Sequence, residues 1–258
     1  MVTNNPESDG AKVAEYILNV NTPAFPQPGP GLRNYYASLC GLMAFAAYMG
    51  EAKGMSEGGS LESLFNAIRK YTADMADALE RIDDQMFSTA VKWKDITAVE
   101  TIGDYTDRAS AAFIAAKYVE VDGMMATTVD TENWCHVNYF AHEPEKIGTV
   151  VVSTKHFSNF SRVKETIMTV NCIGRASLLI TTGTAQDYDI ENQEDVCMIP
   201  EAPEGYDFIE PILNYIPGAI LASYSAAIHD EPYFRGNESP QAVSKCGTTI
   251  KSSQIRLI

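Results

Sequence analysis

Short apolar runs alternate with helical patterns along the second half of the chain, and this alternation most constrains its fold. Strand-like runs occupy 96–103, 148–153, 176–181 and 196–199, and helical patterns occupy 104–120, 161–174 and 212–229. Buried strands alternating with helices of this length form a parallel sheet with right-handed crossovers. We therefore expect an α/β fold, whose ligands lie beyond the carboxyl ends of the strands near Gly103, Ser153 and Thr181.

The first third of the chain carries two further helical patterns. Residues 33–54 are apolar almost all round, which predicts a buried helix. Residues 60–86 place Leu64, Ile68 and Tyr71 on one face, which predicts an amphipathic helix. A short helix over 9–16 and a β-prone run over 17–20 precede them.

The charge balance and the cysteines exclude several classes of protein. The chain has 34 acidic and 19 basic residues and a net charge of −15, which opposes nucleic-acid binding through phosphate neutralisation. Its five cysteines show no CxxC spacing, so we expect reduced thiols, no zinc or other metal site, and a cytoplasmic protein. No apolar run approaches the roughly 20 residues that cross a bilayer, and the N-terminus lacks signal-peptide features.

Two candidate proton carriers stand sixteen residues apart. Glu120 ends the segment Lys117-Tyr-Val-Glu120, and His136 ends Glu132-Asn-Trp-Cys-His136. A carboxylate that moves a proton between neighbouring carbons and an imidazole that handles ring opening would suit the isomerisation of a sugar. Cys135 beside His136 suggests a Cys–His nucleophile, but adjacent residues point in different directions, so we disfavour that alternative.

These motifs and their order resemble the sugar isomerase (SIS) family of phosphosugar-binding domains, in particular the isomerase half of glucosamine-6-phosphate synthase and the fructosamine-phosphate deglycases. The similar segments are Ile102-Gly103, Lys117-Tyr-Val-Glu120, Thr131–His136, and 212–229 followed by Asp230-Glu-Pro232. The resemblance implies a three-layer, flavodoxin-like SIS domain over 95–258, preceded by the C-terminal part of a first SIS-like domain over 1–55 and a linking helix over 56–94.

The resemblance also implies roles for individual residues. Glu120 would be the base that moves the proton, and His136 would enter the site of a second subunit, so a homodimer is expected. Lys245 would orient the sugar carbonyl, with Lys251 as the rival assignment. An enediol route of this kind needs neither a metal nor an organic cofactor.

The phosphate-binding loop of the family has no counterpart before Val2. The nearest substitute is the segment with Ser153, Ser158 and Ser161, which follows a strand and opens a helix. We expect that the natural protein is longer, that a partner chain completes the first domain, or that the phosphate site is lost.

Three functions remain open from the sequence. The leading hypothesis is a phosphosugar isomerase or deglycase that acts on a ketose or amino-sugar 6-phosphate. The alternatives are a non-catalytic module that binds a sugar phosphate, and an obligate half of a two-chain enzyme. The substitution of Asn133 for the acidic residue usual in the family favours the non-catalytic module.

Overall fold

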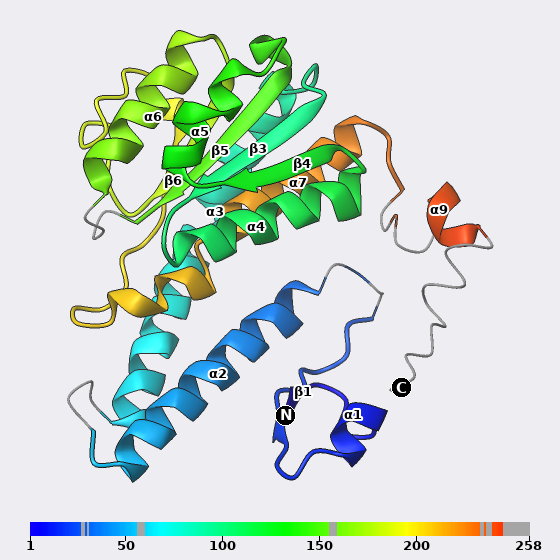
Figure 1. The fold of residues 1–258 in the computed structure, drawn as a ribbon, viewed down its shortest axis with the longest axis vertical. Coiled ribbons are helices and arrows are strands. Elements are labelled where there is room, and N and C mark those ends of the chain that lie inside the picture. Colours follow the sequence, from blue (N-terminus) through cyan, green and yellow to red (C-terminus); the bar gives the residue numbers. More distant parts are fainter. Residues whose placement is uncertain are drawn as a thin grey trace.

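The computed structural model describes residues 1–26, 29, 31–55, 60–154, 159–232, 235 and 239–244. Its centre is a parallel sheet of five strands, and helices cover both faces (Figure 1). The strands are β3 (Ala98–Gly103), β4 (Met125–Val129), β5 (Ile147–Ser153), β6 (Ala176–Thr181) and β7 (Val196–Met198), in the spatial order β4-β3-β5-β6-β7. The predicted α/β fold with a parallel sheet is confirmed.

Two hydrophobic clusters on opposite faces of the sheet divide the helices into layers. One cluster joins the sheet to α3 (Leu61–Lys92), α4 (Asp107–Lys117) and α7 (Ile216–Ile228). The other joins it to α5 (Thr131–His136) and α6 (Phe160–Cys172). Strand residues alternate between the two clusters because successive side chains point to opposite faces: Val150 belongs to the first and Val151 to the second.

Several shorter helical segments accompany these elements. The chain forms η2 (Tyr118–Asp122), η3 (Asn138–Phe140), η4 (Pro144–Lys146), η5 (Gln193–Asp195), η6 (Asp207–Ile212) and, near its end, the short helix α9 (Pro240–Val243). The chain passes from β3 to β4 on one side and then crosses back over β3 to β5 on the other, so the direction in which strands are added reverses here. The carboxyl ends of β3 and β5 therefore form the topological switch point of the sheet.

The N-terminal segment forms a small unit of its own. β1 (Val2–Thr3) and β2 (Leu18–Asn19) pair as a parallel two-stranded sheet, with α1 (Asp9–Lys12) between them. The long helix α2 (Leu32–Ala52) lies against this sheet and against α3 (Figure 1). Tyr36 Oη and Thr72 Oγ1 are 2.8 Å apart across the α2–α3 contact.

The prediction that α2 is buried is wrong. None of its residues is buried, and Leu42, Phe45, Tyr48 and Met49 are exposed. The two-residue strands of the N-terminal sheet are too short to cover one side of a helix of 21 residues, and α3 covers only another side. The apolar pattern of α2 therefore exceeds what the described part of the chain can bury.

The other predicted helices are confirmed, with different ends. The helix expected over 60–86 continues to Lys92, and Ser60 caps it by accepting the backbone N–H of Ser63 at 3.1 Å. The helix expected over 212–229 begins only at Ile216, because Pro217 occupies its first turn, where no backbone N–H is needed. The segment expected as a loop over 131–136 is the short helix α5, and β4 before it was not expected.

Candidate active site

Glu120 lies on a π-helical turn that extends α4. α4 ends at Lys117, and the turn η2 continues to Asp122 before Gly123 stops it in a left-handed conformation with a φ of 80°. The side chain of Glu120 is 35% exposed and forms an ion pair with Lys117, whose own side chain is 10% exposed. Single π-helical turns of this kind are frequent at functional sites. The geometry leaves the carboxylate half-buried and accessible.

Lys117 links this carboxylate to the start of α2. Its Nζ lies 4.7 Å from the centre of the Phe113 ring, a cation–π contact. Phe113 in turn stacks on Tyr35 of α2, with ring centres 4.0 Å apart. Glu120 is therefore close to the first turns of α2, although 85 residues separate it from Tyr35 in the sequence.

A pocket of about 880 Å³ lies between the N-terminal segment and the second half of the chain. The residue after Glu120, Val121, forms part of its wall together with Ser223, Ala226 and Ala227 of α7. The opposite wall comes from residues 21–25 and from the first turn of α2, including Arg33 and Asn34. A pocket of this size, mostly apolar with a few polar groups, is typical of a small-molecule site.

Arg33 brings a positive charge to this pocket of an otherwise acidic protein. Its guanidinium donates a hydrogen bond to the Pro23 carbonyl at 2.7 Å and lies 3.9 Å above the centre of the Phe25 ring. It belongs to the first turn of α2, whose backbone N–H groups favour negative charge. The pocket wall therefore combines a cation and a helix start, which favour an anion, with the carboxylate of Glu231.

Behind the pocket wall, Asp122 holds η2 to α7. Its carboxylate accepts a hydrogen bond from Ser225 Oγ at 2.5 Å and contacts His229 Nδ1 at 3.0 Å. His229 caps the end of α7, with its side chain 27% exposed, and contacts a carboxylate 107 residues away in the sequence.

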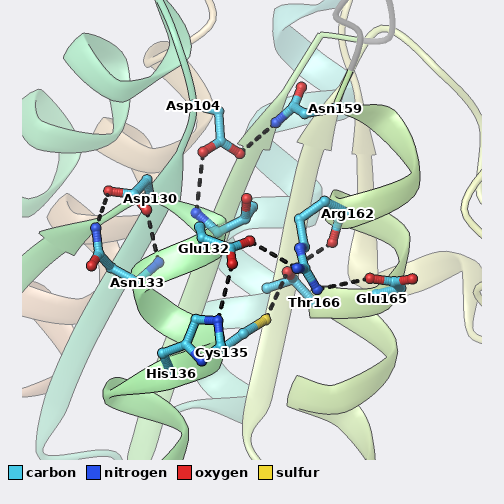
Figure 2. Close-up of polar contacts among 11 residues, drawn as sticks. Asp104, Asp130, Glu132, Asn133, Cys135, His136, Asn159, Arg162, Glu165 and Thr166 are labelled. Carbon is cyan, nitrogen blue, oxygen red and sulfur yellow. Dashed lines mark hydrogen bonds and ion pairs between the residues drawn. The ribbon is translucent and has the colours of Figure 1, made fainter.

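His136 lies on the outside of α5, in a chain of charged side chains (Figure 2). Its side chain is 70% exposed, and Nε2 lies 3.0 Å from Glu132 Oε1. Glu132 also pairs with Arg162 of α6 at 2.8 Å. The hydrogen bond with His136 and the charge of Arg162 lower the pKa of Glu132. The imidazole is thus held on the surface, with its other face open to solvent.

Beneath α5, a buried ion pair fixes this helix to the sheet. Glu100 of β3 pairs with Arg175, and it also accepts hydrogen bonds from Trp134 Nε1 at 3.0 Å and Asn138 Nδ2 at 2.7 Å. Arg175 donates a further bond to the Asn138 carbonyl at 2.6 Å. The side chain of Arg175 is fully buried. These bonds hold Trp134 and Asn138, which lie on either side of His136 in the sequence.

Glu120 and His136 do not meet within one chain. Glu120 lies on η2, whose Tyr118 and Val121 pack into the cluster on one face of the sheet. His136 ends α5, whose Trp134 packs into the cluster on the other face. The sheet therefore separates the two predicted proton carriers. Lys245, the third predicted catalytic residue, and Lys251 lie outside the described residues.

The carboxyl edge of the sheet, where the serine cluster was predicted to bind phosphate, is lined by carboxylates. Ser153 ends β5 as expected, but it is buried and its Oγ accepts a hydrogen bond from Tyr188 at 3.1 Å. Asp107 accepts bonds from the backbone N–H and the hydroxyl of Thr154 at 2.8 and 3.1 Å. Ser161 is exposed on the first turn of α6, and Ser158 lies outside the described residues.

Asp104 accepts hydrogen bonds from two further donors at this edge. It accepts the backbone N–H of Thr131 at 3.1 Å and Asn159 Nδ2 at 2.6 Å (Figure 2). Burial raises the pKa of the neighbouring Asp107 to about 6, although the hydrogen bonds from Thr154 and Asn214 act to lower it. Phosphate binding by the serine cluster stays a prediction.

In the described ranges, no group of three or more His, Cys, Asp or Glu side chains is arranged to hold a metal ion. In the same ranges, no helix is both long and apolar enough to cross a membrane.

Comparison with known proteins identifies the fold. The C-terminal domain of glucosamine-fructose-6-phosphate aminotransferase from Francisella tularensis superposes with a TM-score of 0.76 at 16% identity, over 90% of this chain and 63% of that one. This chain has the SIS fold. Tagatose-6-phosphate ketose/aldose isomerase from Escherichia coli aligns over 90% of this chain and 61% of its own, with a TM-score of 0.64 at 9% identity.

A third structure shares the same SIS architecture. Glucosamine-6-phosphate deaminase from Thermotoga maritima aligns over 91% of this chain and 63% of its own, with a TM-score of 0.59 at 14% identity. This chain thus spans somewhat less than two thirds of the length of each of these three structures. No family model matches the sequence. No curated protein matches it either.

Sequence reasoning missed most of the residues that line the pocket beside Val121. Arg33 and the wall formed by α7 carry no motif, and only the tertiary structure brings them to the pocket. Asp122 could have been singled out, since it follows Glu120 by two residues and directly precedes a glycine. His229 had no such signal, because its partner Asp122 lies far away in the sequence.

Proposed function

We propose that this SIS-fold chain acts on a ketose or amino-sugar 6-phosphate as an isomerase or deglycase, by proton transfer through an enediol. The observation that carries the proposal is Glu120, an accessible carboxylate on a π-helical turn whose next residue lines a pocket of about 880 Å³. The solved structures with the same fold include proteins described as acting on sugar 6-phosphates.

In this proposal, the substrate occupies the pocket with its phosphate toward Arg33 and the start of α2. The Glu120 carboxylate takes a proton from one carbon next to the carbonyl and returns it to the neighbouring carbon, so that the enediol is the intermediate. Lys117, which pairs with Glu120, holds the carboxylate in place. Lys245 is the proposed partner of the sugar carbonyl.

His136 would come from a second copy of the chain and open the sugar ring. Two observations support this arrangement: the sheet separates His136 from Glu120 within one chain, and the imidazole faces outward on α5. The exposed apolar residues of α2 also suit an assembly larger than one copy. We therefore propose a homodimer in the cytoplasm with shared sites.

A second candidate is a module that binds a sugar phosphate without turnover. It is favoured by the separation of the two proton carriers and by the carboxylates that occupy the donors at the edge of the sheet. An obligate half of a two-chain enzyme would share these features. Both candidates predict ligand binding without isomerisation by this chain alone.

The test combines ligand binding with turnover. Thermal unfolding is followed with fructose, glucosamine and fructosamine 6-phosphates, and a ligand at about 100 times its dissociation constant adds roughly 2.7 kcal/mol to the free energy of unfolding. The Glu120→Gln variant should bind the same compound and lose turnover. Glu145→Gln, an exposed carboxylate on η4, serves as the control and should keep wild-type activity.

Each outcome separates the candidates. Turnover by the wild type that Glu120→Gln abolishes supports the isomerase or deglycase. A stability shift without turnover supports the binding module or the obligate half of a two-chain enzyme over an isomerase formed by this chain alone. If Glu120→Gln turns over substrate at the wild-type rate, Glu120 is not the base and the proposed mechanism is wrong.

A further inference from the structure

The π-helical turn that carries Glu120, and whose Val121 lines the pocket, is backed by a polar cluster that the proposed reaction does not use. Asp122 of η2 and Ser225 of α7 are buried, and His229 completes the cluster at the end of α7. Buried carboxylates are costly unless they are paired and hydrogen-bonded. The position of this cluster, two residues after Glu120, suggests a role in holding the turn.

The hydrogen bonds of His229 define its charge. Nδ1 faces the carboxylate of Asp122 at 3.0 and 3.3 Å, and Nε2 faces the backbone carbonyl of Lys94 at 3.3 Å. A carboxylate and a carbonyl can only accept, so both ring nitrogens must donate. Both bonds form together only when the imidazole is protonated. His229 is therefore an imidazolium in this arrangement.

The surroundings agree with a charged imidazole. Burial acts to lower the pKa of His229, but the hydrogen bond and the negative charge of Asp122, the Lys94 carbonyl and the charge of Glu231 outweigh it and raise that pKa. Glu231 is itself paired with Arg235. On its own turn, Asp122 also faces Tyr118, whose fully buried hydroxyl has no hydrogen-bond partner among the described residues. The charged groups that face His229 are thus mainly acidic.

The pair formed by Asp122 and His229, called the anchor below, contacts the π-helical turn η2. π-helical turns are rare, and η2 keeps its shape through the bond from the Gly123 N–H to the Tyr118 carbonyl at 3.0 Å and through side-chain contacts. Val119 is exposed and Glu120 is partly exposed, so Tyr118, Val121 and Asp122 supply the contacts that fix the turn. Among these three, Asp122 makes the hydrogen bonds to α7.

We propose that Asp122 and His229 are positioning residues, whose carboxylate–imidazolium pair ties the π-helical turn to α7 and so fixes the place of Glu120 beside the pocket-lining Val121. The catalytic consequence rests on the proposed function, whereas the anchor itself does not. Displacing a reacting group by about 1 Å can cost about 100-fold in rate. The anchor therefore controls the rate constant of the reaction rather than the affinity for the substrate.

Nuclear magnetic resonance of the histidine ring nitrogens tests the anchor directly in the full chain. Near neutral pH, both nitrogens of His229 should carry a proton, and the ring should titrate above its ordinary value of 6.5. The exchange rate of the Gly123 amide, corrected for its intrinsic dependence on pH, should rise as His229 loses its proton. A neutral His229 ring near neutral pH would overturn the proposal.

Two variants and a matched control separate the anchor from general electrostatics. Asp122→Asn removes the charge, so the pKa of His229 should fall and the amides of η2 should exchange at least about tenfold faster. His229→Gln keeps one hydrogen bond without the charge and should have a smaller effect. Asp230→Asn removes an exposed carboxylate next to His229 and leaves the bonds of His229 to Asp122 and Lys94 in place. The η2 amides of this variant should exchange at the wild-type rate.

The kinetic measurement tells this proposal from the proposed function. If a sugar phosphate is turned over, Asp122→Asn should lower kcat by about 10- to 100-fold with a KM close to that of the wild type. If the wild type turns over no substrate, the proposed function fails, and amide exchange in η2 still decides on the anchor. The proposal of the anchor would be overturned if the η2 amides of Asp122→Asn exchange at the wild-type rate, or if the substitution raises KM and leaves kcat unchanged.

Discussion

Arg175 and Glu100 form an ion pair in the core of the protein, directly beneath the helix that carries His136. Arg175 is fully buried, and Glu100 also accepts bonds from Trp134 and Asn138 on that helix and the turn after it. The sheet and the proposed ring-opening histidine are thus connected through one buried charge pair. Removing one partner leaves the other charged, buried and without its counter-ion.

The substitution Arg175→Met should therefore lower the free energy of unfolding by about 3–5 kcal/mol. The double variant Glu100→Gln, Arg175→Met should recover part of this loss, because no charge stays buried alone. Urea unfolding of both variants measures the difference. The exposed pair of Lys70 and Asp74 on α3 supplies the control, since Lys70→Met should change stability little. A single variant as stable as the wild type would contradict the prediction.

Asp107 makes the stability depend on pH between about 4 and 6. Burial raises its pKa in the folded protein from 3.8 to about 6, so the folded state holds the proton more tightly than the unfolded chain. The free energy of unfolding should then fall as the pH rises through this window, by an amount on the order of 2–3 kcal/mol from this group.

The variant Asp107→Asn should lack this dependence. The Asn214 amide, whose Oδ1 has no hydrogen-bond partner in the described part of the chain, can turn to accept a bond from the new side chain. Urea unfolding of both proteins over this pH window should show their stability difference changing in favour of the variant as the pH rises. Asp77→Asn, an exposed carboxylate on α3, should leave the profile unchanged. Parallel profiles for Asp107→Asn and the wild type would contradict the assignment.

Gly218 is required where α7 crosses α4. A Cβ added there would lie 2.5 Å from Ile114 Cδ1 and 2.6 Å from its Cγ1. Gly218→Ala should therefore lower the free energy of unfolding by about 1–3 kcal/mol through overpacking, although alanine favours helices. In Gly50→Ala on α2 the nearest contact is the Met55 carbonyl at 3.4 Å, so thermal unfolding should show little loss there. Equal effects of the two substitutions would speak against a tight crossing.

Mixing two inactive variants tests the shared site. If Glu120 and His136 act in one site but come from different copies, Glu120→Gln and His136→Asn should each be inactive. Co-refolding them should restore about a quarter of the wild-type activity, because half of the dimers are mixed and one of their two sites is intact. Light scattering checks that dimers form. No recovery from mixed dimers would place both residues in the same copy, or leave one of them outside the site.

The sequence alone was sufficient for the layers of the fold. Apolar runs such as 148–153 and 176–181 are buried on both faces, and this local pattern specifies a parallel strand wherever it occurs. The helical spacing of Leu64, Ile68 and Tyr71 specified α3 for the same reason. Glu120 and His136 were also singled out from the sequence, because each ends a short motif and the spacing between them is fixed, and their roles stay predictions.

The tertiary structure decided which residues share a site. Whether Glu120 and His136 meet depends on which face of the sheet each helix covers, and local pattern carries no information about that choice. The same holds for α2, whose apolar residues predicted burial that the small N-terminal sheet does not supply. Asp122 and His229 became partners only because η2 packs against α7, 107 residues further along the chain. Contacts of this kind depend on packing between distant elements, which no single stretch of sequence specifies.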